Sequence, residues 1–233
     1  MQICIVYYKR HKARHFEALS TREPGTNLEL SNGQFGYSDL QLNPNVCLLD
    51  GHDCIIGKGK SATVQKGELN GKIIAIKIFL PLNLNSWTME TDIYKQIVDH
   101  ENILKFLGVT EQNNIQGTEY WLGTEYHRNG SLYDFLKINL ISWKDFCTII
   151  LSIAKGLAFL HEENSTIGKP SIAHRDFKSK NVLIKDDLTA CISDFGLALV
   201  LDSHINSDSQ VAQVGTTRDE LILHLKYKFF CLE

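Results

Sequence analysis

The pattern of apolar and polar residues changes character near the middle of the chain. In the first half it predicts five short strands, over residues 54–56, 63–69, 72–79, 105–109 and 120–124. Asn70-Gly71 joins the second and third strands and is a strong signal for a tight hairpin. A helix is predicted over 86–98, so we expect this half of the chain to form a small antiparallel sheet with one helix.

Helical spacing dominates the second half of the chain. A short helix is predicted over 131–138 and a long one over 143–162, which begins with the capping box Ser142-Trp143-Lys144-Asp145. The apolar positions on one face of the long helix are Phe146, Ile149, Ile150, Ile153, Leu157 and Leu160. Short apolar runs over 182–184 and 190–192 predict two further strands. We therefore expect two lobes, the first rich in strands and the second in helices, joined near 125–130.

The residues before the first lobe do not share these periods. Residues 18–45 are polar, contain several glycines and prolines, and are predicted to be a linker, with the globular part beginning near Val46. Residues 3–8 are apolar and aromatic and are followed by four basic residues within 9–14. This pattern fits a short buried strand and the cytoplasmic edge of a membrane helix about equally well. No stretch of the sequence is long enough to span a bilayer by itself.

Composition narrows the classes of function. The chain has 233 residues, of which 43% are hydrophobic and 22% charged, as in an ordinary globular protein. Its net charge of -3 gives no reason to expect nucleic acid as a partner. Its six cysteines are scattered without a C-x-x-C pair, which favours a reducing compartment over a disulfide framework or a zinc site.

The strongest chemical signal lies around the two strands predicted near the end of the second lobe. The two segments are His174-Arg175-Asp176-Phe177-Lys178-Ser179-Lys180-Asn181 and Asp194-Phe195-Gly196. Phosphoryl transfer needs a carboxylate to accept or orient the proton of the attacking hydroxyl, and Asp176 fits that role. It also needs oxygen ligands that hold Mg²⁺ on the nucleotide phosphates, and Asn181 with Asp194 fits that role. Either segment alone could be a charged surface loop, but both in this order are the pattern of protein kinases.

A nucleotide-binding signal precedes these segments. Gly57 and Gly59 lie between two strands, where glycine lets the backbone pass over phosphates, although an ordinary hairpin is about as probable. The resemblance of Gly59-Lys60-Ser61 to a Walker A loop fails, because no glycine stands at position 54 and no helix follows. Lys77 lies in an apolar strand and is expected to pair with Glu90, which suits the helical phase better than Asp92, and to reach the phosphates. The apolar residues expected around the adenine are Ile56, Val64, Ala75 and Leu183.

Taken together, these segments resemble a eukaryotic protein kinase. A lysine two residues after Asp176, as Lys178 is, resembles the pattern of serine/threonine kinases and disfavours a tyrosine kinase. The longer strings over 100–104, 174–183 and 188–199 resemble receptors of the transforming-growth-factor-β superfamily. Type I receptors of this family carry a Ser-Gly-rich box before the kinase, and residues 18–50 hold none. The chain is therefore most similar to the type II receptors, the activin type II receptors in particular. Ala62 replaces the third loop glycine of the family pattern, a change that such receptors tolerate, and the resemblance implies that it lies at the ATP site with Gly57 and Gly59.

This resemblance implies a fold, a reaction and a domain organisation. The fold is α+β, a bilobal protein-kinase fold with a complete small lobe and the first part of the large lobe. The reaction is transfer of the ATP γ-phosphate, with Mg²⁺ or Mn²⁺, to Ser or Thr of a type I receptor, with Asp176, Lys178, Lys77 and Glu90 as catalytic residues. The expected segments are the membrane-helix end and basic juxtamembrane segment (1–17), the linker (18–50), the small lobe (51–126), the partial large lobe (127–218) and a non-kinase tail (219–233). The parent receptor is expected at a membrane, with this part on the cytoplasmic side.

The end of the chain departs from the family pattern. The resemblance by motif is expected to end at Arg218, and residues 219–233 alternate with a strand-like period. A read-through, an alternative exon or an error of the gene model is the favoured explanation, and a genuine regulatory tail is the alternative. The apolar face of the helix over 143–162 is then expected to lack its covering helix, which leaves a poorly stable large lobe. The alternative function is a truncated isoform that binds nucleotide or receptor partners without phosphotransfer.

Overall fold

The computed structural model describes residues 41–43, 45–115 and 117–201. The expectations for residues 1–17 and 219–233 therefore lie outside the described residues, as does most of the linker predicted over 18–50. Among the described helices, none is both long and apolar enough to cross a membrane.

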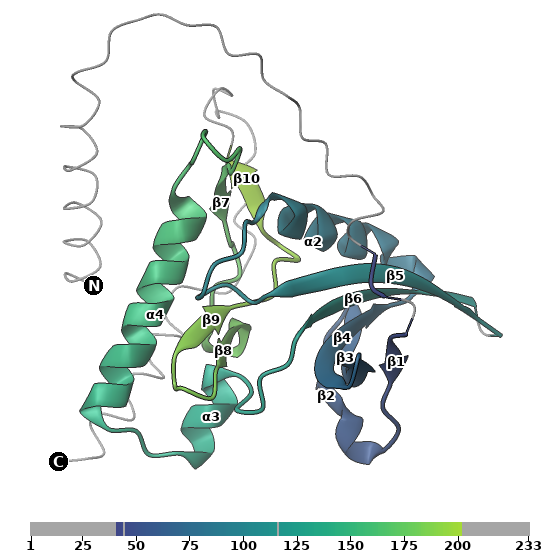
Figure 1. Ribbon diagram of the computed structural model, residues 1–233, viewed down its shortest axis with the longest axis horizontal. Coiled ribbons are helices and arrows are strands. Elements are labelled where there is room, and N and C mark those ends of the chain that lie inside the picture. The colour runs from purple at the N-terminus through teal and green to yellow at the C-terminus, as the bar shows by residue number, and fades with distance from the viewer. Residues whose placement is uncertain (1–40, 44, 116, 202–233) are drawn as a thin grey trace, which may run out of the picture. The chain divides into compact units, whose positions relative to one another are not determined.

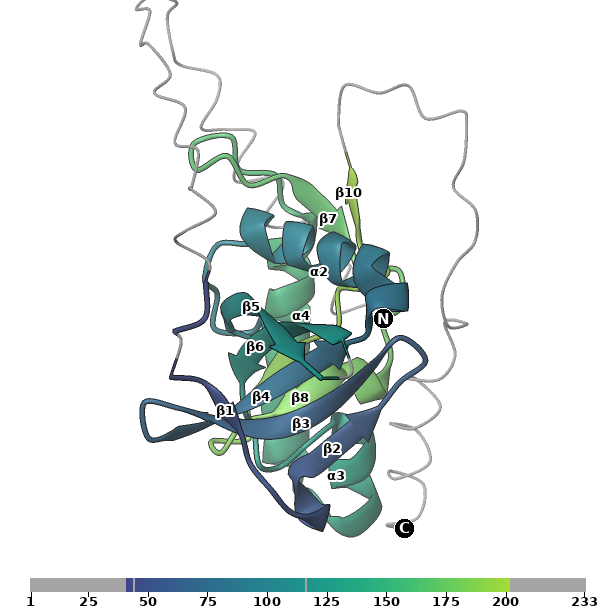
Figure 2. The same ribbon diagram turned by 90° about the vertical axis from the view of Figure 1, so that its right-hand side faces the viewer.

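An antiparallel sheet forms the first lobe, as predicted. Its six strands are β1 (Cys47–Leu48), β2 (Ile55–Lys58), β3 (Ala62–Leu69), β4 (Lys72–Phe79), β5 (Phe106–Asn114) and β6 (Gly117–Glu125). They follow the order β1-β3-β4-β6-β5, with β2 also paired to β3 (Figure 2). Asn70 and Gly71 both have positive φ, 52° and 76°, which is the conformation that the tight hairpin between β3 and β4 requires. β5 and β6 extend beyond the predicted strands. Their additional outer residues, 110–114 and 117–119, were not predicted because they are polar or glycine and carry no apolar alternation.

One helix, α2 (Leu84–Gln96), packs against β4 and β6 of this sheet (Figure 1). It begins two residues earlier than predicted, directly after a 3-10 turn that contains Pro81. Its buried face consists of Trp87, Glu90, Thr91, Ile93 and Tyr94. A glutamate within an otherwise largely apolar buried face needs a cationic partner, because an unpaired buried carboxylate is costly.

The end of the segment predicted to be a linker is part of the sheet. Leu42 and Val46 are buried, and they pack with Ile74, Ile76 and Trp121 on the sheet face opposite α2. The backbone N–H of Leu42 also donates a hydrogen bond of 2.9 Å to the carbonyl of Val109. Two isolated apolar residues in a polar stretch show no period, so the sequence pattern could not reveal that they cover the sheet.

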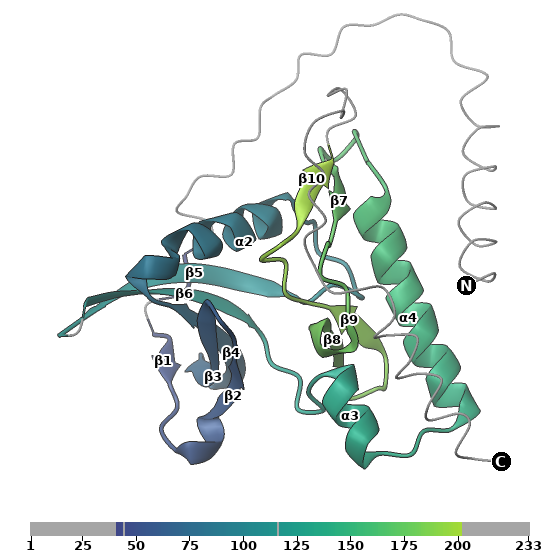
Figure 3. The ribbon, with the colours of Figure 1, turned by 180° about the vertical axis from the view of Figure 1, so that it is seen from behind.

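Within the described residues, the second lobe contains two helices and two small two-stranded sheets (Figure 3). Its elements are α3 (Leu132–Ile138), α4 (Trp143–His161), β7 (Ser171–Ala173), the 3-10 turn η4 (Ser179–Asn181), β8 (Val182–Ile184), β9 (Ala190–Ile192) and β10 (Leu199–Leu201). The predicted capping box is present, because the Ser142 side chain accepts from the Asp145 N–H and the Asp145 side chain accepts from the Ser142 N–H. Both helices and the strands β8 and β9 agree with the sequence pattern.

The expectation that the apolar face of α4 lacks a cover is wrong. Ile149 and Ile153 are 1% and 5% exposed, and they pack in one core cluster with residues of α3, β8 and β9. Ile150 and Leu157 are half-buried against the same cluster. The family resemblance implied that this face needs a helix that the chain lacks, whereas α3 and the β8–β9 hairpin cover it within the described residues.

The loop that follows α2 in the first lobe is hydrogen-bonded to β9 of the second lobe. The backbone of Ile192 in β9 donates 2.9 Å to the carbonyl of Asn102, and the carbonyl of Ile192 accepts 2.8 Å from the N–H of Leu104. The Asn102 side chain donates a further 2.9 Å bond to the carbonyl of Ala190. A Cβ on Gly156 of α4 would come within 2.7 Å of the Asn102 carbonyl, so only glycine allows α4 to lie this close.

Candidate active site

Lys77 of β4 joins the two lobes at the candidate site. Its Nζ lies 2.7 Å from Glu90 Oε2 of α2 and 2.8 Å from Asp194 Oδ1 in the loop after β9. Burial alone would lower the pKa of Lys77, but the two carboxylates outweigh it and raise this pKa above its ordinary value. Burial raises the pKa of Glu90 despite the neighbouring ammonium group. The predicted pairing of Lys77 with Glu90 rather than Asp92 is therefore present, and Lys77 remains a cation.

Strand register places most of the predicted ATP-binding residues on one face of the sheet. Val64 pairs directly with Lys77, and Ala62 and Ala75 lie two residues along the same strands, so all four share a face. Gly57 pairs with Val64 and adjoins the same surface. This face also holds Leu122 and Thr124 of β6, which the sequence analysis did not select.

The strand register does not place the remaining predicted ATP-binding residues on this face. Gly59 donates a backbone hydrogen bond of 2.9 Å to the Ala62 carbonyl, which closes the β2–β3 turn. Leu183 of β8 forms an isolated bridge with Ser131 at the start of α3, so it belongs to the second lobe. Ile56 is 42% exposed on β2, and the described contacts do not bring it to the other residues.

Asp176 is the centre of a second group of side chains, in the loop between β7 and β8. Its carboxylate Oδ2 accepts from Lys178 Nζ at 2.7 Å and from Asn181 Nδ2 at 3.1 Å. Asn181 Nδ2 also donates 2.9 Å to the Asp176 carbonyl. The structure thus brings Asp176, Lys178 and Asn181 together, and the carboxylate is held by two donors in a buried position.

A buried histidine connects this loop with the loop that carries Asp194. His174 accepts at Nδ1 from the Asp176 N–H at 3.3 Å, and its Nε2 lies 2.9 Å from the Ser193 carbonyl. Burial lowers the pKa of His174, so the ring is neutral and Nε2 donates to Ser193. The Ser193 N–H and hydroxyl both donate to the Asn181 carbonyl. These bonds hold the backbone of Asn181 against the residue that precedes Asp194.

Aromatic packing holds the Asp194 loop beneath α2. Phe195 is fully buried, with its ring centroid 5.1 Å from Tyr94 in an edge contact and 5.3 Å from His174. Asp194 itself has a φ of 66°, a left-handed conformation that is uncommon for a residue other than glycine. Sequence reasoning did not assign Tyr94, Phe195 or His174 a role, although the last two lie within the motifs that it selected.

The oxygen donors of Asn181 and Asp194 fit a hard divalent cation. The amide nitrogen of Asn181 is committed to Asp176, so the amide oxygen is the atom available to a cation. The Asp194 side chain is 42% exposed and presents a carboxylate. Within the described part of the chain no group of three or more His, Cys, Asp or Glu side chains could hold a metal. Mg²⁺ bound through one carboxylate, an amide oxygen, phosphates and water matches this sparse donor set.

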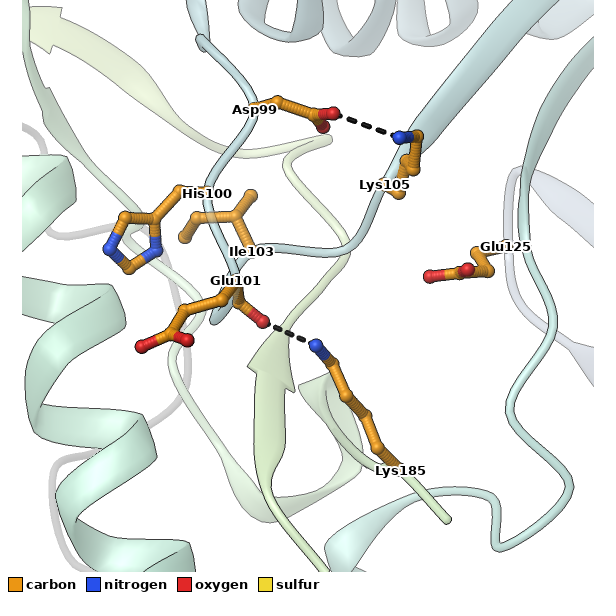
Figure 4. Close-up of a pocket in the computed structure, with 7 residues that line it drawn as sticks. All are labelled: Asp99, His100, Glu101, Ile103, Lys105, Glu125 and Lys185. Carbon is orange, nitrogen blue, oxygen red and sulfur yellow. Dashed lines mark hydrogen bonds and ion pairs between the residues drawn. The ribbon is translucent and has the colours of Figure 1, made fainter. Parts of the chain in front are cut away.

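A pocket with a different lining lies where the two lobes meet (Figure 4). It has a volume of about 260 Å³ and is lined by Asp99, His100, Glu101, Ile103, Lys105, Glu125 and Lys185. Lys105 pairs with Asp99 at 2.9 Å, and Lys185 donates to the Glu101 carbonyl. None of the predicted catalytic, ATP-binding or metal residues lines this pocket.

The lysine bridge, the held carboxylate and the oxygen donors of Asn181 and Asp194 are the features that phosphoryl transfer from a nucleotide requires. The sequence pattern of the family described as "Protein kinase domain" matches residues 52–228. The chain therefore belongs to the protein kinase family, and the predicted bilobal fold is confirmed. The family match continues past Arg218, where the resemblance by motif was expected to end.

Known relatives place the chain more narrowly. It is 43% identical to human activin receptor type-2A over 222 residues, which covers 93% of this chain and 41% of the receptor. The chicken activin receptor type-2A is 43% identical over 216 residues, covering 91% of this chain and 40% of that protein. Rat TGF-beta receptor type-2 is 41% identical over 177 residues, 71% of this chain and 31% of that receptor. The similarity to activin type II receptors predicted from the motifs is confirmed, and the chain spans about two fifths of the length of the activin receptors.

Proposed function

We propose that the chain transfers the γ-phosphate of ATP to serine or threonine hydroxyls of a protein. The observation that carries this proposal is Lys77, whose ammonium group lies between Glu90 and Asp194. A lysine held in this way is oriented toward the phosphates of a nucleotide on the same sheet face. Lys178, hydrogen-bonded to the Asp176 carboxylate, supports the serine/threonine class.

Each predicted residue then has a defined task. Asp176 orients the acceptor hydroxyl and takes its proton, and Lys178 steadies the transferred phosphoryl group. Asn181 and Asp194 hold Mg²⁺ or Mn²⁺, which when bound neutralises charge on the phosphates. The residues expected to surround the nucleotide remain Ile56, Gly57, Gly59, Ala62, Val64, Ala75 and Leu183.

The similarity to activin receptor type-2A supports a narrower proposal for the partner. The protein substrate is a type I receptor of the same superfamily, phosphorylated on Ser or Thr at the cytoplasmic side of a membrane. Membrane attachment is expected through a segment of the parent receptor, and the net charge of -3 gives no reason to expect nucleic acid as a partner.

A phosphotransfer assay on the full chain tests the proposal. Purified protein with Mg-ATP is expected to phosphorylate a serine peptide, and Asp176→Asn is expected to lower kcat by at least about a hundredfold, the scale of a lost catalytic base. The matched control is Asp92→Asn, on the exposed side of α2, which is expected to change kcat by less than twofold. Nucleotide binding by fluorescence titration is measured in parallel. Binding of Mg-ATP without phosphotransfer by the unaltered chain would overturn the proposal in favour of a nucleotide-binding module.

A further inference from the structure

Two lysines share one aromatic ring beside the proposed catalytic loop. The ammonium group of Lys137 lies 4.0 Å from the ring centroid of Tyr133, and that of Lys180 lies 4.9 Å from the same centroid. Lys137 and Tyr133 belong to α3, whereas Lys180 belongs to η4, so the cluster joins two elements that pack together. Attraction between a cation and an aromatic face holds both lysines at this surface.

The cluster has an excess of positive charge. Lys137 has Asp134 Oδ1 at 3.9 Å, with both side chains more than half exposed, and the other carboxylate oxygen of Asp134 accepts from Ser131 at 2.6 Å. Lys180 is exposed, and no carboxylate of the described residues lies within 4.0 Å of its ammonium group. An exposed ammonium group held on a tyrosine, without a carboxylate of its own, is available to an anion from outside the chain.

The position of Lys180 gives this charge a consequence for substrates. Lys178, two residues before Lys180, and Asn181, directly after it, both donate hydrogen bonds to Asp176 Oδ2. Asp176 and Lys180 are four residue steps apart, a path of at most about 14 Å. An extended peptide advances about 3.3–3.6 Å per residue, so a residue two to four positions from a hydroxyl at Asp176 can reach the lysine cluster.

We propose that Lys137 and Lys180 form a specificity-determining site for protein substrates with an anionic side chain two to four residues from the phosphorylated hydroxyl. The anion is a carboxylate of Asp or Glu, or the phosphate of an already modified Ser or Thr. This inference rests on the proposed phosphotransferase function and names the class of sequence which that function selects. Long lysine side chains that only cover the apolar surface of Tyr133 would give no such preference.

Peptide substrates test the proposal with the full chain. One serine is placed in a neutral background, and Ala, Glu, phosphoserine or Lys is placed singly at each position from four before to four after it. At the best position we expect Glu to raise kcat/KM over Ala by about three- to tenfold, mainly through KM, as for exposed charge pairs. Phosphoserine, with more negative charge, is expected to give a larger ratio, and added salt is expected to reduce both ratios.

Charge reversal distinguishes recognition from a structural role. Lys180→Glu is expected to abolish the Glu-to-Ala ratio and to favour the Lys peptide, and Lys137→Gln is expected to reduce the ratio partially. Lys72→Glu, the same charge change at an exposed position of the β3–β4 hairpin, is the matched control and should leave the ratio unchanged. A ratio that Lys180→Glu and Lys72→Glu alter equally would overturn the proposal.

Peptide binding keeps this inference separate from the proposed function. The affinity of fluorescein-labelled Glu, phosphoserine and Ala peptides is measured by anisotropy with the same variants. Phosphotransfer to no peptide overturns the proposed function, and tighter binding of the anionic peptides that Lys180→Glu removes still supports the recognition site. Equal rates and equal affinities for Glu, phosphoserine and Ala peptides overturn the inference alone.

Discussion

Replacing Glu90 with glutamine tests the role of the buried bridge at Lys77. The substitution keeps the shape of the side chain and an oxygen that accepts from the Lys77 ammonium group, but it removes one negative charge. Glu90 and Lys77 have side-chain exposures of 3% and 22%, and Asp194 remains 2.8 Å from Lys77. The three side chains carry two carboxylates and one ammonium group, so the variant brings their sum to zero and leaves no unpaired charge.

The magnitudes predict that Glu90→Gln lowers activity strongly but changes stability little. A hydrogen bond between charged groups contributes about 1.5–3 kcal/mol, whereas burying a carboxylate costs several kcal/mol, so Glu90→Gln should change the free energy of unfolding by no more than about 1 kcal/mol. Lys77 keeps its ion pair with Asp194 but has only a neutral oxygen at position 90, so it is held less firmly in the orientation that the phosphates require. If about 1.5–3 kcal/mol is lost at the transition state, kcat/KM for ATP falls about ten- to hundredfold.

Steady-state kinetics and urea unfolding of the same preparations measure both quantities. Glu68→Gln, an exposed position of β3, is the matched control and should alter neither. Lys77→Ala should instead cost about 3–5 kcal/mol of stability, because it leaves Glu90 without its cation. Wild-type kcat/KM in Glu90→Gln, or a loss of stability as large as that of Lys77→Ala, would refute the reasoning.

Three further predictions concern stability. Ser142→Ala removes the capping box of α4 and should cost about 1 kcal/mol in urea unfolding; no change would mean that the cap is dispensable. Ile192→Val, at a fully buried position of β9, should cost about 0.5–1.5 kcal/mol, and the exposed Leu151→Ala should cost less. Burial lowers the pKa of His100, His127 and His174 in the folded protein. Above the unfolded pKa of about 6.5 these histidines are neutral in both states, whereas below it the unfolded state binds more protons and the folded state loses stability. The melting temperature should therefore fall between pH 7.5 and pH 5.5, and a flat profile would contradict this assignment.

Local signals in the sequence were sufficient for most of the fold. The β3–β4 hairpin follows from Asn70-Gly71, and the start of α4 follows from Ser142 and Asp145, because turns and caps are decided by neighbouring residues. The outer halves of β5 and β6 could not be predicted, since their polar residues show no apolar alternation and are held by pairing across the two strands, including a 2.8 Å hydrogen bond from Thr118 Oγ1 to Asn113 Oδ1. Leu42 was missed for a related reason, because its burial depends on residues of β4 and β6 that are distant in the sequence.

At the candidate site, too, local signals predicted one part of the arrangement and missed another. The motifs predicted which side chains carry chemistry, and the structure brings Lys77 to Asp194 and Asp176 to Asn181. They did not predict how the loops are held, because the packing of Phe195 on Tyr94 depends on the position of α2. The cover of the α4 face was also mispredicted, since helical spacing identifies an apolar face but not the element that packs on it.

The bonds between the loop after α2 and β9 have a mechanical consequence. They fix the carbonyl of Asn102 and the N–H of Leu104 to Ile192, only two residues before Asp194. A rotation of the sheet that preserves these bonds must pivot close to them, so the displacement of a residue grows with its distance from them. Such a rotation moves the far end of the sheet relative to Asp176, while the loop after α2 and the strand that leads to Asp194 stay in register.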